Sequence, residues 1–175
     1  LVSVTNGSLA DDTIKKLNDD MLAMWNAGFD VGFLLLDIYS GTVITGNPNI
    51  YFYSASTLKG PYACAIALKD SYRAADYKDL IWSTISQSNN EAYISLRNTF
   101  GSGAMSSYMS EAGVSGVSPS ENYTDERVKD LAKLWVRNCE FFCQGEANVS
   151  WVRPYFRHTK NSYMETIIEK ANLKS

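Results

Sequence analysis

The chain has 175 residues, of which 45% are hydrophobic and 20% charged, and its formal net charge is −3. This length and composition fit one ordinary globular domain with a sizeable core, so we expect a single domain over residues 1–175. The acidic balance, without any basic run interleaved with aromatic residues, argues against binding to nucleic acid or to an anionic membrane.

Residues 9–27 carry the pattern of an amphipathic helix. Ser8 and Asp11 fit a capping box, and Gly28 is a common helix stop. An apolar stripe at helical spacing is formed by Ile14, Leu17, Met21, Leu22, Met24 and Trp25.

The stretch "VGFLLLDIYSGTVITGN", residues 31–47, predicts two strands around a tight turn at Ser40 and Gly41. The first strand is apolar on both faces, so we expect it in the middle of a sheet and covered on both sides. No other segment is a convincing strand; the alternative is that "GEANVSWVRPYF" contains further strands.

The rest of the chain predicts helices. We expect one over about 56–70, two more separated by a break at Ser88-Asn89-Asn90, and a short one ending at Gly113. Thr124 is placed to cap the next helix, and the C-terminal residues suggest a last amphipathic helix. The expected fold class is therefore α/β of the α+β type, mostly helical, with an antiparallel sheet reduced to the N-terminal hairpin.

Ser56 and Lys59 form an S-x-x-K motif at the start of a helix rich in small residues. Residues three apart share a helix face, and a hydroxyl beside an amine at a helix N-terminus is suited to nucleophilic catalysis. However, a chain with about twenty serines and ten lysines contains roughly one such motif by chance.

Ser88-Asn89-Asn90 is a second constellation with two interpretations. Ser88 followed by Glu91 fits a capping box, which needs no catalytic role. Alternatively, it is an S-x-N motif on a loop that faces the S-x-x-K helix.

Together the segments "ASTLK", "SQSNNEAY" and "YTDERVKDLAKL" resemble the penicillin-recognising serine acyl enzymes, namely class A β-lactamases and the related D,D-peptidases. The similarity covers most of residues 9–137. It implies a β-lactamase-like fold with an antiparallel sheet and a helical domain, and a bacterial protein of the cell envelope or extracellular space. Asn89 stands where class A enzymes commonly have aspartate, which weakens the assignment to that subclass.

The resemblance also implies residue roles. Ser56 is the expected acylated nucleophile, Lys59 the group that accepts its proton, and Ser88 the proton relay to the leaving nitrogen. Asn90 is expected to bind the amide side chain of the substrate, and Tyr53 to line the cleft, although a packing role for this tyrosine is an alternative.

Two departures from the family pattern bear on activity. The sequence contains no K-[ST]-G triplet, so we expect a longer polypeptide or a second chain to supply that strand. Glu121 is the only carboxylate in the loop where class A enzymes carry the deacylation base, but a solvated loop residue is the simpler interpretation, since exposed charges usually need no further explanation.

We expect no cofactor and no metal. Cys64, Cys139 and Cys143 give an odd cysteine count with a single histidine in the chain, which favours buried thiols over a disulfide framework or a zinc site. The sequence therefore predicts a serine hydrolase of the β-lactamase or D,D-peptidase type, acting on a β-lactam or a D-Ala-D-Ala-like amide. The alternative is a catalytically silent module with the same fold, used for binding or structure.

Overall fold

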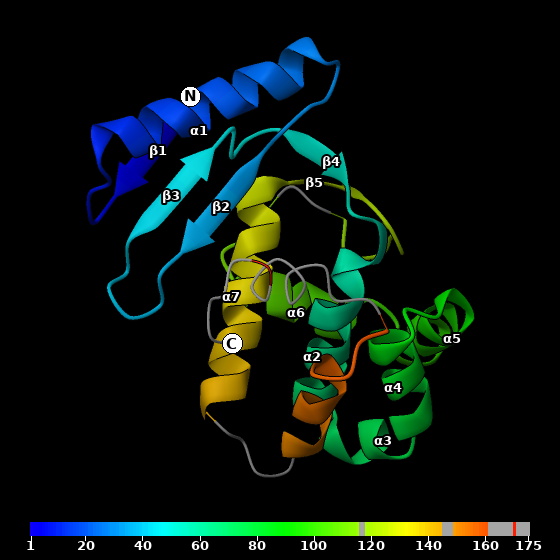
Figure 1. Cartoon of the computed structure of the whole chain (residues 1–175). Coiled ribbons are helices and arrows are strands. Elements are labelled where there is room, and N and C mark those ends of the chain that lie inside the picture. The colour runs from blue at the N-terminus through cyan, green and yellow to red at the C-terminus, as the bar shows by residue number, and fades with distance from the viewer. Residues whose placement is uncertain (116–117, 145–148, 161–169, 171–175) are drawn as a thin grey trace.

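The computed structural model describes residues 1–115, 118–144, 149–160 and 170. The fold is mixed and mostly helical, with small antiparallel sheets (Figure 1). The strands are β1 (Val2–Thr5), β2 (Phe33–Leu36), β3 (Val43–Gly46), β4 (Tyr51–Tyr53) and β5 (Asp125–Arg127). The α-helices are α1 (Asp11–Asn26), α2 (Lys59–Lys69), α3 (Ser71–Ala75), α4 (Lys78–Ser86), α5 (Asn90–Phe100), α6 (Gly103–Glu111) and α7 (Val128–Gln144). Two 3₁₀ helices, η1 (Ala55–Leu58) and η2 (Ser150–Phe156), complete the described elements.

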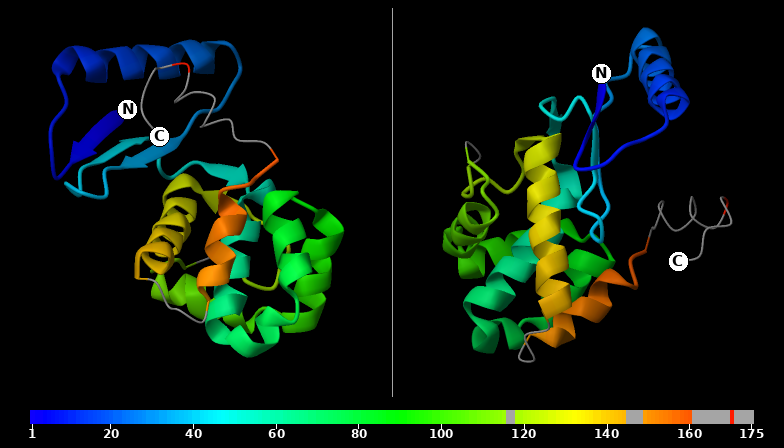
Figure 2. Two further views of the ribbon diagram at one scale, coloured as in Figure 1. Left: turned by 60° about the horizontal axis from the view of Figure 1, so that its bottom comes forward. Right: turned by 90° about the vertical axis from the view of Figure 1, so that its left-hand side faces the viewer.

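One end of the molecule is layered. Strands β1, β3 and β2 form an antiparallel sheet in that order, with α1 on one side and α7 on the other (Figure 2). Gly46 allows α1 to approach the sheet, because a Cβ at this position would lie 2.6 Å from the sulfur of Met21 and 2.5 Å from the Phe33 ring. None of the described helices is long and apolar enough to cross a membrane.

Helix α2 is the centre of the helical part, with α4, α6, α7 and η2 packed around it (Figure 1). Every residue from Lys59 to Ala67 is buried. The sequence "KGPYACAIA" explains this position, because small side chains let neighbouring helices approach from all sides and leave the one long polar side chain, Lys59, enclosed.

The short β4–β5 ribbon connects the segment before α2 to the segment before α7. Tyr53 pairs with Asp125, and Phe52 pairs with Glu126. Just beyond the ribbon, the Ser54 N–H donates to the Thr124 carbonyl at 2.9 Å, and the Thr124 N–H donates to the Ser54 Oγ at 3.2 Å. These bonds fix the backbone two residues before Ser56.

The coarse class, a mostly helical α+β chain with an antiparallel sheet, is confirmed, but the expectation of a hairpin alone is wrong. The hairpin of β2 and β3 gains β1, and β4 pairs with β5 across more than seventy residues. Strands of three or four residues are too short to show a periodic pattern. Strand β2 is also not central, because within the described chain only β3 pairs with it, and Leu35 is 55% exposed.

Several helix boundaries differ from the sequence-based expectation. Helix α1 has Ala10 as its N-cap without a side-chain bond, so the capping box at Ser8 does not form. Thr124 does not cap α7, because β5 intervenes and the helix begins at Val128.

Other segments differ in type. The connection after α2 contains the short helix α3, and residues 150–156 are a 3₁₀ helix rather than strand. The C-terminal helix expected in the tail falls largely on residues 161–169 and 171–175, which lie outside the described residues.

We expect Gly60→Ala to lower the free energy of unfolding by about 1–3 kcal/mol, the usual cost of overpacking a filled core. A Cβ here would lie 2.9 Å from the rings of both Trp135 and Phe156. This strain should outweigh the gain in helix propensity of about 1 kcal/mol. Urea unfolding measures the change.

Gly103→Ala is the matched control, since no atom lies within 4 Å of the added methyl group at the start of α6. It should leave stability unchanged or raise it slightly. Equal effects of the two substitutions would contradict the packing explanation.

Candidate active site

Lys59 is a buried amine with three hydrogen bonds. The residue is 2% exposed and begins α2. The Nζ donates to the Ser88 carbonyl at 2.6 Å, to the Asn90 Oδ1 at 2.7 Å and to the Ser88 Oγ at 3.2 Å. The structure therefore brings three of the residues singled out in the sequence, Lys59, Ser88 and Asn90, into direct contact.

Burial lowers the pKa of the Lys59 amine, because the charged form loses solvation. The three hydrogens of a protonated amine match the three acceptors around it. A neutral amine keeps two of these bonds and has one lone pair, which can accept a proton. Lys59 can thus exchange a proton without leaving its partners.

Ser56 lies one 3₁₀ turn before Lys59. The Lys59 N–H donates to the Ser56 carbonyl, and side chains three apart are eclipsed in a 3₁₀ helix, so both side chains lie on the same face. Ser56 is exposed, whereas Lys59 is buried. Within the described chain, neither the hydroxyl nor the backbone N–H of Ser56 has a hydrogen-bond partner, so both are open to a ligand.

The backbone is unusual on both sides of the site. Ala55 has φ +47°, and Ser88 has φ +53°. The other described non-glycine residues with positive φ are asparagines, which tolerate this region far better. Such conformations persist only where the surrounding structure imposes them, and they concentrate at functional sites. Here they set the directions of Ser56 and of the Ser88 side chain.

The Ser88 capping box considered in the sequence does not form. Asn89 is the N-cap of α5, where its Oδ1 accepts from the N–H groups of Glu91 at 2.9 Å and Ala92 at 3.1 Å. The Ser88 hydroxyl is therefore left to Lys59. Asn89 in this position has a structural task.

Tyr53 and Glu121 are placed differently from these residues. Tyr53 is 64% exposed on β4, and its ring centroid lies 6.1 Å from that of Tyr123. Glu121 is exposed, and its backbone carbonyl accepts from Arg97 at 3.1 Å. Among the described interactions, none joins the Glu121 carboxylate to Ser56 or Lys59.

Tyr123 belongs to the site but was missed by sequence reasoning. Its hydroxyl donates to the Asn90 Oδ1 at 3.0 Å, the same oxygen that Lys59 contacts. Burial, and then the neighbouring Tyr53, raises the pKa of this hydroxyl. The sequence shows only that a tyrosine stands directly before Thr124. It does not indicate that this tyrosine contacts Asn90 at the start of α5.

Glu126 is a buried carboxyl on β5. It is 2% exposed, its Oε1 accepts from the Thr124 hydroxyl at 2.8 Å, and its Oε2 has no hydrogen-bond partner in the described chain. Burial raises the pKa of this carboxyl. It borders a cavity of about 10 Å³, which is too small for a substrate.

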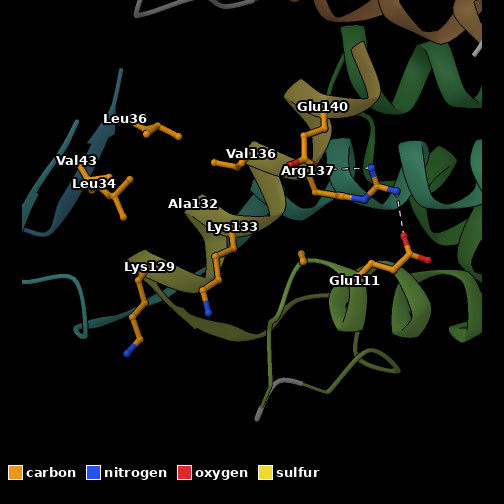
Figure 3. A pocket seen from close by; sticks show the side chains of 11 residues that line it. Leu34, Leu36, Val43, Glu111, Lys129, Ala132, Lys133, Val136, Arg137 and Glu140 are labelled. Carbon is orange, nitrogen blue, oxygen red and sulfur yellow. Dashed lines mark hydrogen bonds and ion pairs between the residues drawn. The ribbon is translucent and has the colours of Figure 1, made fainter. Parts of the chain in front are cut away.

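A separate hollow of about 300 Å³ lies between the sheet and α7 (Figure 3). Leu34, Leu36 and Val43 face Ala132 and Val136 across it, and the ion pair of Arg137 with Glu111, at 3.0 Å, lies at its rim. Its lining includes no serine, cysteine or histidine, and it lacks all the residues around Lys59. This hollow is not the candidate active site.

The cysteines are only partly as expected. Cys64 is buried, and burial raises the pKa of its thiol, but Cys139 and Cys143 are exposed on α7. Their spacing of four places them on a helix face directed away from the core. In the described part of the chain, no group of three metal-ligating side chains comes together.

We expect Glu126→Gln to raise the free energy of unfolding relative to wild type at neutral pH. The raised pKa in the folded state means that wild-type stability falls as pH rises through that pKa, whereas glutamine does not ionise. The advantage should shrink toward acid pH, where the carboxyl is neutral in both states. Urea unfolding between about pH 4 and about pH 8 tests this window.

Asp125→Asn, at an exposed position on the same strand, is the control and should not reproduce the pH dependence. A Glu126→Gln protein that is less stable by a constant amount at every pH would show that the ionised carboxylate is not the unfavourable group.

No protein-family model, no curated protein and no solved structure matches this chain. The chemistry of the site is therefore assessed from its own distances, burial and charges. These describe an exposed hydroxyl at Ser56, a buried amine at Lys59 and a second hydroxyl at Ser88 that touches this amine.

Proposed function

We propose that the protein is a serine acyl-transfer hydrolase of the β-lactamase or D,D-peptidase type, with Ser56 as nucleophile. The observation that carries this proposal is the triple contact of the buried Lys59 amine with Ser88 and Asn90, one 3₁₀ turn from an unpartnered serine. A purely structural lysine is rarely buried without a carboxylate, and here its partners are neutral oxygens. Burial favours the deprotonated amine that general-base catalysis requires, and no carboxylate among its described partners opposes this.

In the proposed acylation step, neutral Lys59 accepts the Ser56 hydroxyl proton while Oγ attacks the substrate carbonyl carbon. The negative charge on the carbonyl oxygen is stabilised by the free Ser56 N–H. As the carbon–nitrogen bond breaks, the proton passes from Lys59 through the Ser88 hydroxyl to the leaving nitrogen. Ester formation on Ser56 and amine release leave Lys59 neutral again.

In the proposed deacylation step, water cleaves the ester. Glu121 is not placed beside Ser56 or Lys59 by any described interaction, so we assign it no part in this step. Among the described interactions, no carboxylate contacts Ser56 or Lys59, so none is placed to activate the water. We therefore expect a long-lived acyl-enzyme rather than rapid turnover of β-lactams.

The proposed substrate is a β-lactam or a D-Ala-D-Ala-like peptide amide, with Asn90 as the donor to its amide side chain and Tyr53 at the rim. This assignment rests on the resemblance of the motifs, as do the proposed β-lactamase-like fold and a location outside the bacterial cytoplasm. No K-[ST]-G triplet occurs in the 175 residues. We propose that a further segment or a second chain supplies the second oxyanion donor.

The missing triplet also favours a second candidate, a catalytically silent module of the same fold. Loss of one oxyanion donor alone costs about 10²–10³ in rate. Acylation of the protein distinguishes the two candidates.

We expect the full-length gene product to gain the mass of one ring-opened penicillin after incubation with a fluorescent penicillin, with the label on the peptide that contains Ser56. Ser56→Ala should abolish labelling. Lys59→Arg keeps the donors but cannot become neutral, and should slow acylation by about 10²–10⁴, the usual contribution of a general base. Intact-mass spectrometry with peptide mapping measures these changes.

A full-length wild type that gains no mass would favour the silent module. Labelling that survives Ser56→Ala would assign the nucleophile elsewhere.

We expect the acylation rate constant to rise with pH and to level off above the pKa of Lys59. Because burial lowers this pKa, the midpoint should lie below the ordinary value for lysine. Stopped-flow fluorescence at a series of pH values gives the profile. A rate that falls over the same range would show that the protonated amine is the active form.

A further inference from the structure

Asn90 holds its side-chain amide in one orientation by means of two donors. Its Oδ1 accepts from the Lys59 Nζ at 2.7 Å and from the Tyr123 hydroxyl at 3.0 Å. A protonated lysine only donates, so the oxygen of the amide must face it, and the tyrosine hydroxyl must then donate as well. The Nδ2 of Asn90 has no partner in the described chain, and the residue is exposed.

We propose that Tyr123 is a positioning residue that keeps the Asn90 Nδ2 directed at the acylamino carbonyl of the substrate. This inference rests on the proposed function and assigns a specificity role that the S-x-x-K and S-x-N motifs do not contain. Tyr123 acts through Asn90 and does not itself exchange protons with the substrate.

The need for a second donor follows from the proton cycle of Lys59. When the amine is neutral, it accepts as well as donates, so it no longer determines which end of the Asn90 amide faces it. The bond from Tyr123 is present in both protonation states. A phenol hydroxyl donates more strongly than it accepts, so this bond favours the amide oxygen, and with it the same orientation, in either protonation state of Lys59.

The position of Tyr123 is itself fixed by one face of α5. Asn90, Tyr93 and Arg97 are spaced by three and four, so they lie on the same side of the helix. All three contact the segment 119–123: Tyr93 donates to the Asn122 carbonyl at 3.0 Å, and Arg97 donates to the carbonyls of Pro119 at 2.6 Å and Glu121 at 3.1 Å.

The ring of Tyr123 is also held from two sides. Its centroid lies 5.6 Å from that of Tyr93 and 6.1 Å from that of Tyr53. These are ordinary distances for interacting aromatic rings. With the backbone docked on α5 and the ring packed, the hydroxyl has little freedom to leave Asn90.

The test compares two β-lactams in the full-length protein. Benzylpenicillin carries an acylamino side chain, and 6-aminopenicillanic acid is the same nucleus without the acyl group. Tyr123→Phe should slow acylation by benzylpenicillin about 5–10-fold and acylation by 6-aminopenicillanic acid less than about twofold. The measured quantity is the ratio of the two acylation rates, benzylpenicillin to 6-aminopenicillanic acid. Both rates are taken on the same sample of each variant, so any unfolded fraction cancels.

Tyr51→Phe, which alters an exposed tyrosine on β4, should change neither rate. In an Asn90→Ala background, Tyr123→Phe should have no further effect on the ratio, because its action passes through Asn90. A merely structural role would slow both compounds equally and would add to the effect of Asn90→Ala.

An unchanged ratio in Tyr123→Phe, with the wild type readily acylated, would overturn this inference and leave the proposed function standing. A wild type acylated by neither compound would overturn both.

Discussion

The buried amine of Lys59 is the constraint on which the site depends. An amine enclosed at the start of a tightly packed helix must find hydrogen-bond partners there, because an unsatisfied charge in a protein interior is very costly. The partners come from the turn between α4 and α5, which supplies a carbonyl, a hydroxyl and an amide oxygen. The same bonds satisfy the lysine and place Ser88 and Asn90 beside the S-x-x-K turn.

The surrounding helices and strands hold this contact between Lys59 and the 88–90 turn in place. Small side chains allow α2 to lie in the middle of the helices, and the β4–β5 ribbon, with the bonds between Ser54 and Thr124, fixes the chain just before Ser56. The segment 119–126 connects α5 to the β4–β5 ribbon, because it contacts α5 through Tyr93 and Arg97 and continues into β5. The nucleophile segment and the Asn90 segment are thereby held by one continuous stretch of chain.

Local patterns were readable in the sequence. The helical spacing in residues 11–26, the hairpin and the break at Ser88-Asn89-Asn90 all depend on neighbours within a few residues, and the structure contains each of them. The motif pairing of Lys59 with the 88–90 turn was inferred from a resemblance rather than from local physics. Both Ser88 and Asn89 could cap α5. Asn89 does so, and the Ser88 hydroxyl accepts from Lys59 instead.

The remaining features depend on contacts between distant segments. Residues far apart in the chain come together in the pairing of β4 with β5, in the contact of Tyr123 with Asn90 and in the burial of Glu126. Strands of three residues are also too short to show a periodic pattern. The same limit explains why the cysteines of α7 were expected to be buried although they face outward. A spacing of four defines a shared helix face but does not say which way that face points.

The titration of Lys59 is the most direct test of the proposed chemistry. Lysine carbons next to the amine can be labelled and followed by NMR, with the Lys59 signal assigned by its loss in Lys59→Arg. A buried amine among neutral acceptors should titrate below the other lysines of the chain, and acylation of Ser56 should shift its signal. A Lys59 that titrates together with the surface lysines would remain protonated at neutral pH, and it could not take the proton of Ser56.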